Sequence, residues 1–363
     1  MNFPVKIFRY EDRIGNLKAE SKGVVKGEKH FPVFEDGLIF KPLTKSKPFT
    51  TPLFAYAEVF LSRVIHEYFM EVPLYELAHC VGCSENVPKY YDYGTVVPSL
   101  YGKDQHLMNL LEFYRQYPDD RIDIDQYVNY CMMFYDYTDV FETSFFKEHR
   151  EIAGSLAMHV LCAVLKGDQN YHYENVAFLC DSDGEILRLA PMIDHEFSTY
   201  FMFPDDHMRH AHWLVELLRS IEGQKVAEGE YDFLSDPQER RLMEQSAVCL
   251  NRNLTYIRDY FPDITAEFLK RLERFVEDLQ KEQRHFEIEK AGDYPFTANS
   301  SRYRIGMARY KEQDEELARM YEKQYSGRDK EIDFERLNKM LLREILTVAE
   351  DMENILGKNE ENR

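Results

Sequence analysis

Residues 165–178 read LKGDQNYHYENVAF, and residues 187–197 read LRLAPMIDHEF. An apolar helical pattern stops at Gly167, a common helix terminator, and a polar loop follows. The runs NVAFLCD and ILRLAPMID then flank the turn sequence SDG, which predicts a β-hairpin. Asn175 enters the first strand where Asp194 leaves the second, so the hairpin is expected to bring these two side chains together.

The polar loop carries Asp168, Asn170 and His172. Phosphoryl transfer requires hard oxygen ligands for Mg²⁺ and a group that positions the attacking hydroxyl. Each residue taken alone is more often an ordinary turn residue, a packed histidine or a helix cap. Their combination after a helix and around a hairpin favours a phosphotransfer site.

These segments resemble the catalytic and metal-binding segments of HipA-like serine/threonine kinases, a bacterial family related to phosphoinositide kinases. That family reads G-N-x-D-x-H-x-x-N-x-x-(F/L)-L and then L-A-P-x-x-D. His172 and Asn175 fall on its His and Asn, Asp194 falls on its metal-binding Asp, and Ala190 and Pro191 also match. The resemblance implies a kinase that uses ATP and Mg²⁺, with Asn175 and Asp194 holding the metal.

The sequence departs from the family at the catalytic position. Asn170 stands where the family has its catalytic Asp, and Asp168 stands where the family has Asn. An amide cannot accept the proton of a substrate hydroxyl as a carboxylate can. The favoured interpretation is that Asp168 reaches the nucleophile while His172 braces the loop. The alternatives are a dispensable base or impaired catalysis, which would make the chain a nucleotide-binding pseudokinase.

The N-terminal part offers a lysine and a glutamate for the nucleotide. Lys41 lies in the strand-like run GLIFKPL, and Glu58 lies in the amphipathic helical run AYAEVFLSRVIHEYF. We interpret Lys41 as a ligand of the α- and β-phosphates and Glu58 as its ion-pair partner, a pairing that HipA-like kinases share. Each residue alone is equally typical of a solvated surface.

The remaining expected nucleotide contacts are weaker. The segment ESKGVVKGEKHF occupies the place of a phosphate-covering loop, in which glycine lets backbone N–H groups approach phosphate oxygens. Ser21, Lys22 and Gly23 are its candidate contacts, although an ordinary surface turn fits the segment as well. The strand TVVPSLYG, with Val97 and Leu100, is the expected hinge that holds adenine.

The order of elements predicts an α+β, two-lobed protein-kinase-like fold. Residues 1–100 are expected to form a small β-rich N-lobe, and residues 101–363 a mainly helical C-lobe with a helical C-terminal extension. Helices are expected at 106–117, 125–146, 150–167, 237–260, 264–290, 307–325 and 332–356. The resemblance covers roughly residues 15–200.

The composition and net charge of the chain limit the classes of partner that it is expected to bind. The chain has 363 residues, 44% of them hydrophobic and 30% charged, and a formal net charge of −20, which argues against direct nucleic-acid binding. The start MNFPVKIFRYEDR predicts no signal peptide, no apolar run is long enough for a membrane span, and six scattered cysteines favour a reducing bacterial cytoplasm. We expect a protein substrate of unknown identity. The alternatives are a small molecule and a lipid, and the acidic charge of the chain makes the lipid the less compatible of the two.

Overall fold

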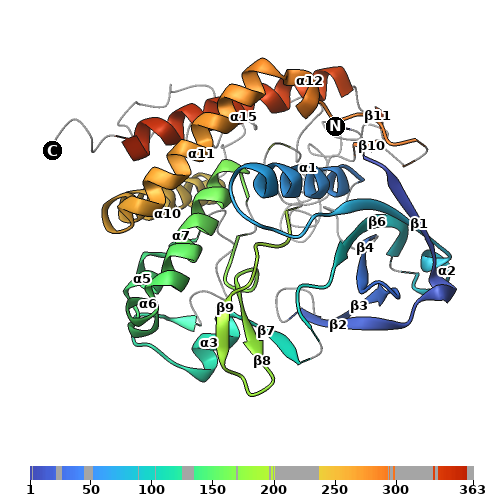
Figure 1. The fold of residues 1–363 in the computed structure, drawn as a ribbon, viewed down its shortest axis with the longest axis horizontal. Coiled ribbons are helices and arrows are strands. Elements are labelled where there is room, and N and C mark those ends of the chain that lie inside the picture. Colours follow the sequence, from blue (N-terminus) through green and yellow to red (C-terminus); the bar gives the residue numbers. More distant parts are fainter. Residues whose placement is uncertain are drawn as a thin grey trace.

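The computed structural model describes residues 1, 3–21, 27–44, 52–88, 90–102, 104–124, 135–168, 171–195, 198, 200, 237–292, 294, 297–298, 330–331 and 334–357. A strand-rich part built by the first hundred residues lies on one side of the molecule, and the long helices lie on the other (Figure 1). The predicted α+β class, with a β-rich N-terminal part and a mainly helical C-terminal part, is confirmed.

Six strands form the larger sheet: β1 (Val5–Arg9), β2 (Gly15–Ser21), β3 (Gly27–Val33), β4 (Leu38–Thr44), β5 (Glu76–Val81) and β6 (Tyr90–Pro98). Their order is β1-β5-β6-β4-β3-β2, with β1 parallel to β5 and the other neighbours antiparallel. In the middle of the sheet, Lys41 of β4 lies opposite Thr95 of β6. The short helices η1 (Tyr10–Asp12) and α2 (Cys83–Asn86) follow β1 and β5.

The two faces of this sheet enter different cores, because successive side chains of a strand point to opposite faces. Phe40 of β4 and Val96 of β6 belong to a small core that also contains Cys80. Val97, one position further along β6, belongs to the main core together with the helix that follows β4. Lys41 and Thr95 therefore lie on the sheet face that turns toward the main core.

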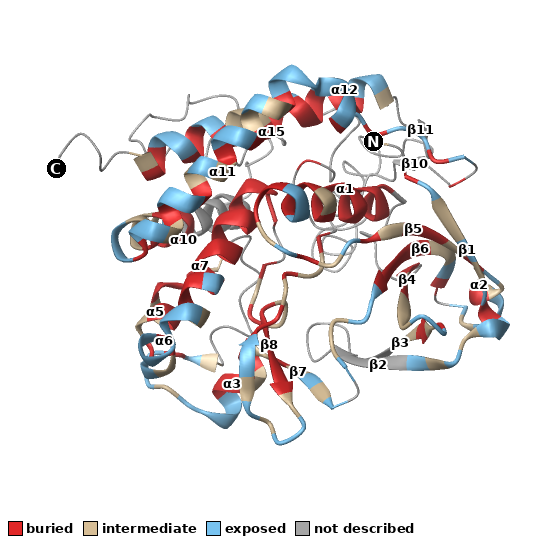
Figure 2. Ribbon diagram, in the orientation of Figure 1, coloured by how far each residue is buried: buried red, intermediate tan, exposed pale blue. Residues whose placement is uncertain are grey.

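Helix α1 (Pro52–Tyr68) lies between the sheet and the C-terminal helices (Figure 1). A helix that is apolar around most of its circumference is a buried helix, and residues 53–62 are all buried (Figure 2). On the side of the C-terminal helices, the rings of Tyr68 and Phe69 lie 5.1 and 5.7 Å from that of Phe275. Contacts on both sides thus fix the position of α1.

A second, three-stranded sheet has the order β7-β8-β9 and comprises β7 (Gln105–Asn109), β8 (Ala177–Asp181) and β9 (Ile186–Leu189). The predicted β8–β9 hairpin is confirmed. The prediction of helix from residue 106 is wrong for its first four residues, because β7 pairs with β8 and the helix begins only at Leu110. Asn109 and Glu112 form a capping box at that point.

The other helices are α3 (Leu110–Gln116), α5 (Thr138–Glu142), α6 (Ser144–Glu148), α7 (Arg150–Leu165), α10 (Pro237–Tyr260), α11 (Pro262–Lys281), α12 (Gln283–Phe286) and α15 (Phe334–Gly357). The helix expected at 264–290 is divided between α11 and α12. Of the helix expected at 125–146, the structure describes only α5 and α6. The helix expected at 307–325 lies outside the described residues. A two-stranded ladder joins β10 (Thr297–Ala298) to β11 (Lys330–Glu331). Within the described residues, every helix is too short or too polar to cross a bilayer.

The connection between the two sheets runs from the end of β6 at Pro98 to the start of β7 at Gln105. The boundary predicted at residue 100 falls in this connection. One hydrophobic core nevertheless continues from α1 and the larger sheet into α7, α11 and α15. The division into lobes at that residue stays a prediction.

Candidate active site

Three charged side chains from separate parts of the chain meet beside α1. The ammonium of Lys41, on β4, lies 2.8 Å from Oε1 of Glu58, on α1. It also forms an ion pair with Asp194, which follows β9. The lysine and glutamate that the sequence analysis paired are therefore in contact, and the aspartate predicted as a metal ligand joins them.

The members of this ion-pair group differ in their access to solvent. Glu58 is 1% exposed and also accepts a hydrogen bond of 2.8 Å from Oγ1 of Thr95. Lys41 and Asp194 are 18% and 23% exposed. Glu58 is thus the buried anchor, whereas Lys41 and Asp194 can reach a bound molecule.

Asp194 is held in an unusual backbone conformation. Its φ is +62°, in the left-handed region that non-glycine residues seldom adopt. Its backbone N–H donates a hydrogen bond of 3.5 Å to the hydroxyl of Tyr75. Burial, reinforced by the Glu58 carboxylate, raises the pKa of Tyr75, so this hydroxyl stays a neutral phenol. The conformation aims the carboxylate at Lys41.

The β8–β9 hairpin places the other predicted metal ligand at the same end as Asp194. The backbone N–H of Ala190 donates to the carbonyl of Ala177 at 2.8 Å, so the segment before Ala177 lies beside the segment after Ala190. Asn175 belongs to the first segment and Asp194 to the second. Among the described residues, no group of three or more His, Cys, Asp or Glu side chains is arranged so that it could hold a metal ion. A site with two protein oxygens suits Mg²⁺, which takes its other ligands from water and phosphate.

His172 lies in a turn of the loop before Asn175. Its Nδ1 accepts a hydrogen bond of 3.2 Å from the backbone N–H of Glu174, and the backbone N–H of Asn175 donates to the His172 carbonyl at 2.8 Å. These contacts tighten the loop around the histidine. The bracing role of His172 stays a prediction.

Asp168 is buried and paired inside the protein. Its carboxylate is 3% exposed and lies 2.7 Å from the ammonium of Lys166. The role of a base would require this carboxylate to reach the substrate hydroxyl, which here means leaving its contact with Lys166. The favoured interpretation of Asp168 as the base stays a prediction. Asn170, the alternative, lies outside the described residues.

The expected nucleotide contacts are described only in part. Val97 pairs with Ile39 and so lies on the same sheet face as Lys41, and Leu100 follows β6 at intermediate exposure. The backbone of Ser21 ends β2, opposite Gly27. The side chain of Ser21, and the whole of Lys22 and Gly23, lie outside the described residues. All five stay predictions.

Four residues in or next to this site were not predicted from the sequence: Thr95, Tyr75, Lys166 and His195. One of them carried a signal. Lys166 follows a helix whose last nine residues are all buried, and a lysine at the end of such a run requires a buried partner. The others could not be recognised, because their contacts join segments far apart in the chain.

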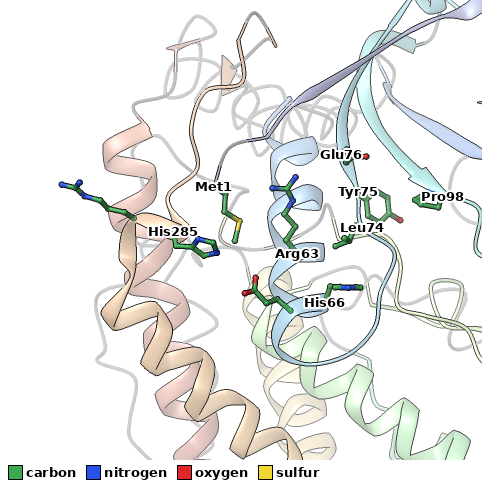
Figure 3. Close-up of a pocket in the computed structure, with 10 residues that line it drawn as sticks. Met1, Arg63, His66, Leu74, Tyr75, Glu76, Pro98 and His285 are labelled. Carbon is green, nitrogen blue, oxygen red and sulfur yellow. The ribbon is translucent and has the colours of Figure 1, made fainter.

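A pocket of about 860 Å³ lies beside α1 (Figure 3). Its described lining comprises Met1, Arg63, His66, Glu67, Leu74, Tyr75, Glu76, Pro98, Arg284 and His285. The ion-pair group does not contribute to this described lining, although Tyr75 belongs to the pocket and also contacts Asp194. The pocket is thus a neighbour of the candidate site, and Tyr75 contacts both.

No family model matches the chain, and no curated protein matches its sequence. Among solved structures, the chain is similar to that described as a Helicobacter pylori proinflammatory kinase CtkA. The two share 12% sequence identity, the match covers 94% of this chain and 98% of that chain, and the TM-score is 0.42.

Proposed function

We propose that this chain is an ATP- and Mg²⁺-dependent phosphotransferase, and that it acts as a HipA-like kinase on serine or threonine of a protein. One observation carries the proposal: Lys41 contacts both Glu58 and Asp194. A strand lysine paired with a helix glutamate, beside a metal-binding aspartate, is the arrangement that protein kinases need for phosphoryl transfer. The motif resemblance around Asn175 and Asp194 supports the same conclusion.

In this proposal each side chain has a separate task. Lys41 binds phosphate oxygens, and Glu58, held by Thr95, fixes the direction of the lysine. Asn175 and Asp194 hold Mg²⁺, which neutralises charge on the phosphates of ATP. The side-chain oxygens of Asn175 and Asp194 fit this metal, since hard oxygen ligands suit a small divalent cation.

The acceptor hydroxyl requires positioning more than deprotonation, because phosphoryl transfer passes through a loose transition state. Because Asp168 is buried beside Lys166, we assign that task to Asn170, with His172 bracing the loop. Asn170 can donate to or accept from a hydroxyl, although it cannot take the proton as a carboxylate can. Transfer is therefore expected to be slow relative to kinases that have an aspartate at this position.

A second candidate function is favoured by the pairing of Asp168 with Lys166. With Asp168 paired to Lys166 and Asn170 in the position of the base, the site could bind nucleotide without transferring phosphate. This alternative is a pseudokinase. It keeps the roles proposed for Lys41, Glu58 and Asp194.

A transfer assay separates the two. The purified chain is incubated with γ-labelled ATP, Mg²⁺ and generic protein substrates, and label is measured on the substrates and on the chain itself. We expect wild type to transfer label, Asp194→Ala to lose it, and Asp183→Ala, at the exposed turn of the same hairpin, to keep it. No more transfer by wild type than by Asp194→Ala would refute the kinase proposal. Nucleotide binding without transfer, together with a gain of activity in Asn170→Asp, would establish the pseudokinase.

A further inference from the structure

We propose that Lys166, Asp168 and His195 form a positioning cluster that fixes the two metal-binding segments relative to each other. The inference rests on the proposed function, in which Asn175 and Asp194 are the metal ligands. Asp168 opens the loop that leads to Asn175, and His195 is the neighbour of Asp194 in the chain. Lys166 contacts both.

The three side chains are buried at the end of α7. The ammonium of Lys166, itself 1% exposed, lies 2.7 Å from Oδ2 of Asp168 and 3.1 Å from Nδ1 of His195. An ammonium can only donate hydrogen bonds, so Nδ1 of His195 is the acceptor and the ring is the tautomer with its proton on Nε2. Within the described residues Nε2 has no hydrogen-bond partner. The contact with Lys166 therefore sets the orientation of the ring.

Further contacts attach the same two segments to each other. The hydroxyl of Ser198 donates to the carbonyl of Lys166 at 2.6 Å, and that of Tyr200 donates to the carbonyl of Leu165 at 2.6 Å. Asp168 and Ser198 also form an isolated antiparallel bridge. The chain beyond His195 is thus bound to the start of the loop.

This attachment accounts for the conformation of Asp194. A residue with a side chain keeps a positive φ only where the surrounding structure determines its position. On one side of Asp194, Tyr75 accepts its backbone N–H; on the other, His195 is anchored to Lys166. Without that anchor, Asp194 can relax to the common region with negative φ, which would turn its carboxylate away from Lys41.

A purely stabilising role explains the cluster less well. Desolvation offsets most of the attraction within a buried ion pair, so such pairs add little net stability and in some proteins serve to define one arrangement. Lys166 holds a residue from each metal-binding segment, which is the arrangement that a positioning role requires. Some residues orient the metal ligands without binding the metal themselves, and replacing such a residue typically lowers the metal affinity by about 10- to 100-fold.

The test compares two substitutions of one residue. His195→Phe keeps a ring beside Tyr75 and removes the acceptor, while Lys166 retains Asp168 as its partner. His195→Asn is the matched rescue, because its amide oxygen can occupy the position of Nδ1. The double variant Lys166→Met/Asp168→Asn removes both charges of the buried pair together. If His195→Phe does not fold, this double variant takes its place in every comparison.

The first readout is binding of a fluorescent ATP analogue while Mg²⁺ is varied, with no substrate present. We expect the half-saturating Mg²⁺ concentration to rise about 10- to 100-fold in His195→Phe and to stay within about threefold of wild type in His195→Asn. The second readout is amide hydrogen exchange of a peptide spanning 190–195 in the nucleotide-free chain. We expect faster exchange in His195→Phe and near wild-type exchange in His195→Asn, with the strand 177–181 as internal reference.

The two readouts separate the two hypotheses. If wild type binds the analogue without any response to Mg²⁺, the proposed function fails, and hydrogen exchange still decides whether the cluster holds the segment. If wild type responds to Mg²⁺ and a folded His195→Phe matches it in both readouts, the positioning role is overturned.

Discussion

Glu58 offers a direct test of the ion-pair group through protein stability. The substitution Glu58→Gln keeps the size of the side chain and removes the charge that faces Lys41. Glu58 is 1% exposed and accepts 2.8 Å hydrogen bonds from both Lys41 and Thr95. A glutamine can retain one of these two bonds through its oxygen, while its NH₂ group then faces a donor.

The magnitude follows from these contacts. A hydrogen bond to a charged group contributes about 1.5–3 kcal/mol. Lys41 keeps Asp194 as a partner and is 18% exposed, so water replaces part of the loss. We therefore expect the free energy of unfolding to fall by about 2 kcal/mol in Glu58→Gln. Thr95→Val removes a hydrogen bond and no charge, and is expected to cost about 1 kcal/mol.

The assay is urea unfolding of both single variants, the double variant and Glu67→Gln, an exposed glutamate on the same helix. Surface substitutions usually change stability by less than about 0.5 kcal/mol, which sets the reference. Because Glu58 and Thr95 are in contact, the double-mutant cycle is expected to give a coupling of about 1 kcal/mol. Equal midpoints for Glu58→Gln and Glu67→Gln, with no coupling in the cycle, would refute the reasoning.

Two further predictions concern residues outside the ion-pair group. Burial, with Lys166 nearby, lowers the pKa of His159 from 6.5 to about 3. Between these two pH values the unfolded chain binds a proton that the folded chain does not. The free energy of unfolding therefore falls as the pH is lowered through this window. Between pH 7.5 and 5, His159→Leu should therefore lose about 2 kcal/mol less of its unfolding free energy than wild type, whereas a His106→Ala control, exposed on β7, should follow wild type. A Cβ added at Gly94 would overlap the backbone carbonyl of Lys41, whereas one at Gly15 would meet open space. Gly94→Ala is expected to lower the unfolding free energy by about 3 kcal/mol and to weaken ATP binding by displacing β4, and Gly15→Ala, measured by the same unfolding and binding titrations, should do neither.

Local sequence patterns were sufficient to predict the helices and strands that bury one continuous apolar surface. The apolar spacing along α1 and α7 predicted both helices, and the turn sequence between β8 and β9 predicted their hairpin. The pattern at 106–109 misled, because a short apolar run fits strand and helix alike. The capping box of Asn109 and Glu112 marks the helix start and could have located it.

The charged residues of the candidate site could be predicted, because few residue types can bind phosphate or Mg²⁺. Lys41 and Glu58 were chosen for their charges and the elements that carry them, and Asp194 for its place after the hairpin and in the motif resemblance. In the fold, Lys41 contacts both carboxylates. The burial of Asp168 could not be predicted, because it depends on the distance of one side chain to Lys166. The contact of Thr95 with Glu58 was likewise hidden, because it depends on the register between β4 and β6 and on the packing of α1.

The central claim is that Lys41 and Asp194 form a phosphate- and metal-binding site. Calorimetric titration of ATP, with and without Mg²⁺, tests it most directly in wild type, Lys41→Met, Asp194→Asn and the control Asp183→Asn. We predict that wild type and the control bind ATP more tightly with Mg²⁺, that Asp194→Asn loses this dependence, and that Lys41→Met binds more weakly in either condition. Wild-type binding that is absent, or that survives both site substitutions unchanged, would contradict the account.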